Sequence, residues 1–145
     1  MEMQRVRVIA YNALRIAAGL AFLTHGGQKL FGLFGAHAAI TPLFHPAQFF
    51  AHFFPFGIAG ILEFFGGALM VLGLFSRPVA FLISGEMAIT YFWMHFGFGQ
   101  RSIWWWSNHG ELPLLYCYIW LFFFAHGPGS FSLDAWRGRR SAGAA

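Results

Sequence analysis

Long apolar runs separated by short polar breaks dominate the chain, and their lengths predict its elements. A helix needs about 20 mostly apolar residues to cross a hydrocarbon core of about 30 Å. The second and third runs form one apolar block, in which a charge and a proline favour a tight turn at Ser76-Arg77-Pro78. The pattern predicts an all-α polytopic membrane protein, a bundle of four transmembrane helices over about residues 8–34, 53–75, 78–98 and 108–126.

The composition supports a membrane protein and excludes several other classes. Hydrophobic residues make up 58% of the chain and charged residues 10%, whereas soluble domains are about 25% charged. Disorder would need low hydrophobicity and high charge. The single cysteine, Cys117, excludes an internal disulfide and a multi-cysteine metal or iron–sulfur site. The net charge of +4 does not indicate nucleic-acid binding, because the nine Lys and Arg residues form no basic stripe.

The distribution of basic residues predicts that both termini lie in the cytoplasm, the N-in/C-in topology. In that orientation, Lys29 and Arg101 lie near the outer side of the membrane. The cytoplasmic side then holds Arg5, Arg7, Arg77, Arg137, Arg139 and Arg140. We therefore expect a single transmembrane domain over residues 1–134, followed by a flexible basic tail over residues 135–145 that lies near anionic lipid.

Ionisable side chains inside membrane helices are costly, so each is a candidate functional residue. A rise of about 1.5 Å per residue places one group of them in the outer half of the membrane or near its middle. Arg15 and Glu86 fall nearer the cytoplasmic end. We predict an inner pair of Arg15 with Glu86, and an outer polar cluster that consists of His25, Lys29, Glu63, His95, Asn108 and Glu111.

Structural roles compete with a functional role at each of these positions. The Arg15–Glu86 pair could fix helix register without taking part in any chemistry. Residues 108–111 (Asn-His-Gly-Glu) fit the capping box of a helix N-terminus. Lys29 could simply extend to the outer surface. Trp104-Trp105-Trp106 fits an interfacial aromatic belt better than a binding role.

The histidines give no specific indication of a metal or haem. His37, His45 and His52 lie in the longest loop, and their intervals of eight and seven residues match no compact zinc pattern. His25 and His95 come from separate helices and could ligate a b-type haem, but their spacing is not specific. We expect no metal site and no intrinsic cofactor.

Several motifs resemble a known family along all four predicted helices. The run His25-Gly26-Gly27-Gln28-Lys29-Leu30-Phe31-Gly32 resembles the HGxxKLxG-like signature of the DoxX family. Pro113 departs from the family, which usually has an ordinary helix former at that position. The similarity continues over residues 60–67 (GILEFFGG), 72–78 (LGLFSRP), 108–112 (NHGEL), 114–116 (LLY), 127–129 (GPG) and 132–134 (SLD).

The resemblance implies a four-helix bundle of the bacterial inner membrane. The best-known members of the family are similar to the small membrane subunits of thiosulfate:quinone oxidoreductases. Other members are linked to sulfur metabolism, oxidative stress, or catechol and quinone detoxification alongside soluble redox partners. The residues that match the family's shared polar core are His25, Lys29, Glu63, Asn108 and Glu111.

The resemblance favours a membrane subunit associated with a quinone-linked oxidoreductase. Quinone is then the ligand, and another membrane or soluble subunit supplies the electron carrier and shares any catalysis. The alternative is a structural or assembly subunit of a larger membrane complex, without an active site of its own. A haem or metal protein and a small transporter are less favoured, because the histidine spacing is unspecific and four helices are too few to form even a narrow pore without oligomerisation.

Overall fold

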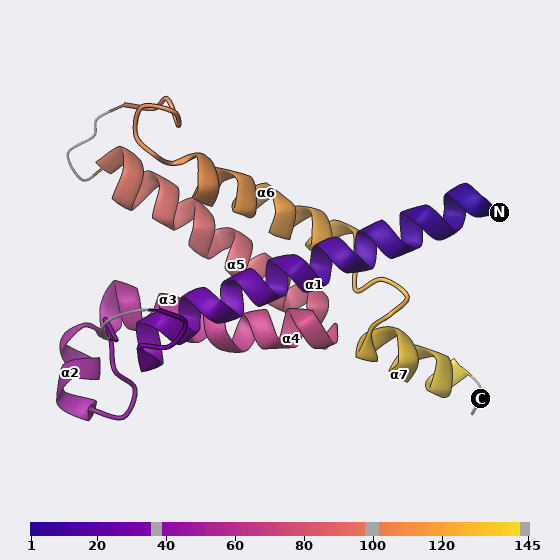
Figure 1. Ribbon diagram of the computed structural model, residues 1–145, viewed down its shortest axis with the longest axis horizontal. Helices are drawn as coiled ribbons and strands as arrows, with labels where there is room; N and C mark the ends of the chain where they lie inside the picture. The colour runs from indigo at the N-terminus through magenta and orange to yellow at the C-terminus, as the bar shows by residue number, and fades with distance from the viewer. Residues whose placement is uncertain (36–38, 98–101, 143–145) are drawn as a thin grey trace. The chain divides into compact units, whose positions relative to one another are not determined.

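The computed structural model describes residues 1–35, 39–97 and 102–142, and every regular element among them is a helix. The chain divides into two compact units (Figure 1). The first comprises Met1–Ser76 with Pro128–Ala145, and the second comprises Arg77–Gly127. Each unit is described by itself below.

The first helix, α1 (Glu2–Phe31), has 30 residues and lies earlier in the chain than predicted. It begins six residues before the predicted start, because residues 2–7 are good helix formers although they are too polar to count as membrane-embedded. It ends at Gly32, which adopts the left-handed conformation with φ 66°. The Gly32 N–H donates to the Gln28 carbonyl at 3.1 Å, a common way for a helix to end.

The second apolar run forms a helical segment over Phe53–Leu72, which is kinked at Phe54 (φ −111°, ψ 127°) and contains π-helical turns. The segment ends at Gly73, whose φ of 65° again requires the left-handed region. A short helix, α2 (Pro46–Ala51), precedes it. The elements of the segment are η1 (Phe53–Gly57), α3 (Ile58–Ile61), η2 (Leu62–Gly66) and α4 (Gly67–Leu72).

The turn that follows lies three residues earlier than the sequence predicts. The chain turns at residues 73–75, and Ser76-Arg77-Pro78 forms the first turn of α5 (Ser76–Thr90). The predicted turn at these three residues is therefore wrong. Proline is tolerated in the first helical turn, where its missing N–H has no intrahelical partner to lose.

The second unit consists mainly of two helices. α5 continues into η3 (Tyr91–Gly97), and α6 (Glu111–His126) follows after a loop. The helices lie side by side in Figure 1. They are joined by a hydrogen bond from Ser84 Oγ to the Cys117 carbonyl at 2.8 Å, and by one from Arg77 Nη1 to the Phe124 carbonyl at 2.9 Å.

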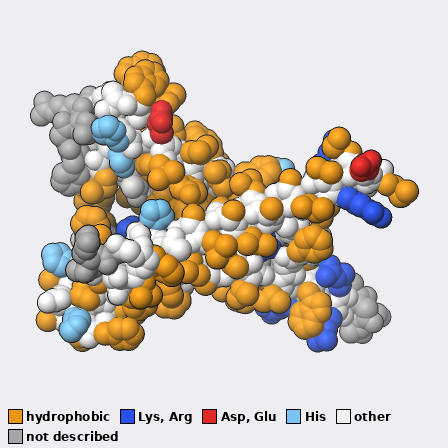
Figure 2. All heavy atoms as spheres, in the orientation of Figure 1, with side chains coloured by type: hydrophobic (Ala, Val, Ile, Leu, Met, Phe, Trp, Pro, Cys, Tyr) orange, Lys and Arg blue, Asp and Glu red, His pale blue; other side chains and the backbone are white. Residues whose placement is uncertain are grey.

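Three of the described helical segments are long and apolar enough to cross a membrane: Glu2–Phe31, Phe53–Leu72 and Ser76–Gly97. α6 is apolar but shorter, with 16 residues. Hydrophobic side chains cover much of the face seen in Figure 2, as expected of helices that contact lipid. The chain is therefore an all-helical, multi-pass membrane protein.

The C-terminal segment differs from the expected flexible tail. Residues Leu133–Ala142 form a helix, α7. Its first turn is held to the first unit through Asp134, whose carboxylate accepts the backbone N–H of Phe75 at 3.0 Å and that of Ser76 at 2.8 Å. The Asp134 N–H donates in turn to the Gly73 carbonyl at 2.9 Å. These bonds anchor the first turn of α7 to the chain around residues 73–76.

Candidate functional site

A buried ion pair joins the two long helices of the first unit. Lys29, in the last turn of α1, places Nζ 2.6 Å from Oε1 of Glu63 in η2. The side chain of Glu63 is 6% exposed and that of Lys29 is 22% exposed. The prediction that both residues belong to one polar site is consistent with this contact. The attraction between two mostly buried charges is stronger than that of a surface ion pair. The lost hydration of both charges opposes this gain.

Glycines let the two helices approach closely enough for this pair to form. A Cβ added to Gly26 would clash with the backbone N of Phe64. It would also lie 2.6 Å from the Phe64 Cα and 2.7 Å from the Gly60 carbonyl oxygen. Farther along the same interface, a Cβ on Gly67 would lie 2.5 Å from the Leu23 backbone N. Small residues that allow such close packing are typical of membrane helix interfaces.

The second carboxylate oxygen of Glu63, Oε2, is buried and has no hydrogen-bond partner among the described residues. Buried polar atoms are nearly always hydrogen-bonded, so each exception calls for an explanation. Glu63 also lies in a π-helical turn, and such turns within α-helices are often found at functional sites. Burial, an unsatisfied oxygen and irregular backbone therefore coincide at one residue.

Two further residues shape the surroundings of the pair. His25 precedes Lys29 by one turn of α1 and is exposed. Thr41 is fully buried, and its N–H donates to the Lys29 carbonyl at 2.9 Å. Sequence reasoning missed Thr41, because a lone threonine in an apolar loop gives no signal of its partner.

The other predicted members of the outer cluster lie in the second unit. His95 Nδ1 lies 3.0 Å from the Asn108 carbonyl oxygen. The buried Asn108 side chain donates to the Ser102 carbonyl at 2.8 Å and accepts from the Gly110 N–H at 2.7 Å. Asn108 therefore organises the loop before α6. Whether this group meets the Lys29–Glu63 pair stays a prediction.

The predicted capping box at residues 108–111 is wrong. α6 begins at Glu111, its N-cap residue is Gly110, and no side chain caps the helix. The Asn108 side chain instead bonds two residues ahead, as asparagine commonly does in turns. Glu111 is exposed, and it lines an open cavity of about 360 Å³ together with Trp105, Leu114, Leu115 and Tyr118.

Arg15 is fully buried and caps the C-terminal end of α4. Its Nη1 donates to the Met70 carbonyl at 2.7 Å, and its Nη2 donates to the Phe131 carbonyl at 2.6 Å. Cations are favoured at this end of a helix, where carbonyls lack intrahelical partners. Glu86 lies half-buried on α5 in the second unit, so its predicted pairing with Arg15 stays a prediction.

The described residues contain no group of three or more His, Cys, Asp or Glu side chains arranged to hold a metal ion. His37, one of the three histidines of the long loop, lies outside the described residues. The site is thus defined by the Lys29–Glu63 pair, with His25 beside it.

The long apolar helices define a polytopic membrane protein, and the Lys29–Glu63 ion pair lies at a glycine-rich interface between two of them. The chain belongs to the DoxX family, whose model matches residues 10–96. It is also similar to an uncharacterized protein of Haemophilus influenzae, with 32% identity over 139 residues that cover 92% of this chain and 93% of the relative. No solved structure matches the chain.

Proposed function

We propose that the chain is an integral-membrane subunit of a quinone-linked oxidoreductase in a bacterial inner membrane, and that its Lys29–Glu63 pair contacts the quinone headgroup. The observation that carries the proposal is Oε2 of Glu63, which is buried without a partner among the described residues. Leaving such an atom unsatisfied costs about 1–3 kcal/mol. This carboxylate oxygen accepts a hydrogen bond, and the hydroxyl of the reduced quinone, the quinol, would donate one and recover this energy.

The residues around the pair fit a quinone headgroup. Lys29 Nζ carries three N–H donors and the ion pair uses one, which leaves donors for a ring carbonyl. Phe31 and Phe64 lie on the two helices that carry the pair, and their rings pack edge to face with centroids 5.0 Å apart. They supply apolar surface beside the charges. His25, one turn of α1 before Lys29, adds a side chain with hydrogen-bonding ring nitrogens.

A bound quinone supplies two-electron chemistry that is coupled to protons. Lys29 orients a ring carbonyl through a charge-assisted hydrogen bond. Glu63 accepts or releases a proton at Oε2, as carboxyl groups do in general acid–base catalysis. A partner subunit that carries flavin, haem or a metal group supplies the electrons.

The proposed topology has four spans with both termini in the cytoplasm. α6 has 16 residues, or about 24 Å of helix, and local bilayer thinning accommodates a helix somewhat shorter than the hydrocarbon core. Cysteine labelling tests this topology in a Cys117→Ser background. A membrane-impermeant maleimide should label Ser141→Cys only from the cytoplasmic side and Ser107→Cys only from the outer side. Labelling of both positions from one side contradicts the four-span topology.

Thermal unfolding of the purified chain in detergent tests quinone binding. A soluble quinone analogue at a hundredfold excess over its Kd stabilises a protein by about 2.7 kcal/mol, which raises the unfolding temperature. Glu63→Gln preserves the shape of the side chain and should remove most of this rise. Glu111→Gln changes an exposed carboxyl and should retain it. A wild-type unfolding temperature that no quinone analogue changes contradicts the proposal.

The second candidate function is a structural or assembly subunit, and the glycine contacts favour it. Gly26, Gly60 and Gly67 explain the close helix packing without any ligand, and Lys29–Glu63 would then only fix the register. In that case the double variant Lys29→Met/Glu63→Met should copurify with the same partners from native membranes as the wild type does. Mass spectrometry of the copurified proteins, together with the absence of a quinone effect, would identify this function.

A further inference from the structure

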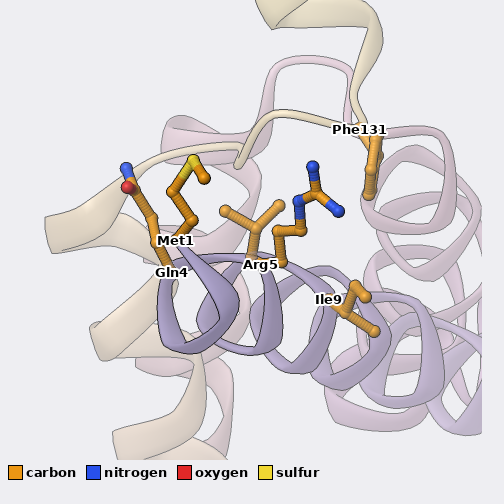
Figure 3. Close-up of a pocket in the computed structure, with 6 residues that line it drawn as sticks. Met1, Gln4, Arg5, Ile9 and Phe131 are labelled. Atoms are coloured by element: carbon orange, nitrogen blue, oxygen red, sulfur yellow. The ribbon is translucent and has the colours of Figure 1, made fainter.

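A cavity of about 510 Å³ lies against the first turns of α1, at the end of the first unit opposite to the Lys29–Glu63 pair. Figure 3 shows the Arg5 side chain rising from α1 toward the segment that carries Phe131. The cavity is lined by Met1, Gln4, Arg5, Val8, Ile9 and Phe131. The Arg5 guanidinium and the Gln4 amide are therefore the polar side chains of a lining that is otherwise apolar.

The wall formed by Phe131 is fixed to α1 by hydrogen bonds. The Phe131 N–H donates to Asn12 Oδ1 at 3.1 Å, and its carbonyl accepts from Arg15 Nη2 at 2.6 Å. Gly129 lets the chain approach this closely, because a Cβ there would lie 2.7 Å from Asn12 Oδ1 and 2.9 Å from the Tyr11 ring. The cavity is thus an open groove whose backbone frame is already fixed, while the Phe131 side chain itself is 63% exposed.

The position of the cavity along α1 matches the boundary between lipid headgroups and acyl chains. α1 has 30 residues and is about 45 Å long, which exceeds a hydrocarbon core of about 30 Å. Its first turns therefore reach the headgroup layer. Arg5 lies in these turns, whereas Val8 and Ile9 lie about one turn deeper, at the level of the acyl chains.

The charge of this end of the unit favours an anionic ligand. Figure 2 shows Lys and Arg side chains around the start of α1 and around α7. The only acidic side chains in these two helices are Glu2 and Asp134, and Asp134 is engaged by the Phe75 and Ser76 N–H groups. The exposed basic residues here are Arg5, Arg7, Arg137, Arg139 and Arg140.

We infer that this cavity binds an anionic phospholipid of the surrounding bilayer. Arg5 holds the lipid phosphate through charge-assisted hydrogen bonds, and the Gln4 amide offers a further donor. Ile9, Val8 and Phe131 contact the first part of an acyl chain. Because the apolar walls continue from the cation into the depth of the membrane, the occupant is a whole lipid rather than a free phosphate. The inference is independent of the proposed quinone site.

Lipid retention measured by native mass spectrometry tests this inference on the full chain. The chain is reconstituted in nanodiscs that contain phosphatidylglycerol and phosphatidylcholine with identical acyl chains, and is then released. Wild type should retain phosphatidylglycerol preferentially. Arg5→Gln should lower that retention about fivefold, the effect of one basic residue near an anionic surface, and should lower phosphatidylcholine retention less, because the choline cation offsets the charge of the phosphate that Arg5 contacts.

Arg7→Gln is the matched control, because Arg7 carries the same charge on the same helix but does not line the cavity. It should retain phosphatidylglycerol as the wild type does. Phe131→Ala should lower the retention of both lipids, and glycerol phosphate, which has no acyl chains, should not compete. Equal losses in Arg5→Gln and Arg7→Gln would indicate diffuse charge attraction and overturn the inference. Effective competition by glycerol phosphate would overturn it as well.

Discussion

Replacing Gly26 with alanine should separate the two helices that hold the Lys29–Glu63 pair. Gly26 is buried where α1 packs against the Phe53–Leu72 segment. The added Cβ would meet the backbone N and Cα of Phe64 and the carbonyl of Gly60. All three contacts are backbone atoms of a helix, so no side chain can rotate away to make room.

The expected cost follows from these distances. The Cβ would lie 2.6 Å from the Phe64 Cα and 2.7 Å from the Gly60 carbonyl, whereas ordinary van der Waals contact begins at 3.4 Å. Relief requires the backbones to move apart by most of an ångström. Overpacking of a core costs about 1–3 kcal/mol, and we expect Gly26→Ala near the upper value because rigid helices must shift.

The assay is the free energy of unfolding in mixed micelles, measured by titration with a denaturing detergent and followed by tryptophan fluorescence. Gly85→Ala is the control, since Gly85 is exposed on α5 and a Cβ there meets nothing within 4 Å. It should raise the stability by about 0.5–1 kcal/mol, because alanine is the better helix former. If Gly26→Ala is as stable as Gly85→Ala, the close helix approach described here is wrong.

Three further perturbations test separate contacts by the same unfolding measurement. Lys29→Met should lower the free energy of unfolding by about 3–5 kcal/mol, because it leaves the buried Glu63 carboxylate without its cation. The double variant Lys29→Met/Glu63→Met should recover most of this loss, and no recovery would argue against a direct ion pair. Asp134→Ala should lower the free energy of unfolding by about 1 kcal/mol, as the loss of a helix cap does, and should speed proteolysis within α7. An unchanged digestion pattern would mean that other contacts hold α7. Ser84→Ala should cost about 0.6 kcal/mol, a typical value for a hydrogen bond between membrane helices, and a cost above 2 kcal/mol would mean that Ser84 does more than bond to Cys117.

The sequence allows the helices to be predicted better than their ends. Apolar runs mark the membrane-embedded part of each helix, so the polar first turn of α1 falls outside the prediction although its residues favour helix. Gly32 and Gly73 follow apolar runs and are typical helix ends, yet hydrophobicity alone places the ends two or three residues later. Pro78 is compatible with both a turn and a first helical turn, and only the backbone distinguishes them.

The contacts of the site differ in how far they can be predicted. A buried carboxylate flanked by glycines on one helix and a lysine near the end of another make Lys29 with Glu63 a natural pair. Arg15 is different, because its partners include the backbone carbonyls of Met70, Val71 and Phe131, which leave no trace in the sequence. Asp134 is likewise far along the chain from the Phe75 and Ser76 N–H groups that it binds.

The central claim is that Glu63 exchanges a proton with a bound quinone, and redox-induced infrared difference spectroscopy tests it most directly. The purified chain is loaded with a quinone, which an electrode then reduces, and the carboxyl C=O stretching region is recorded. The account predicts a carboxyl band that is lost in Glu63→Gln and retained in Glu111→Gln. A spectrum without any such band in the wild type, or one that Glu63→Gln leaves unchanged, would contradict it.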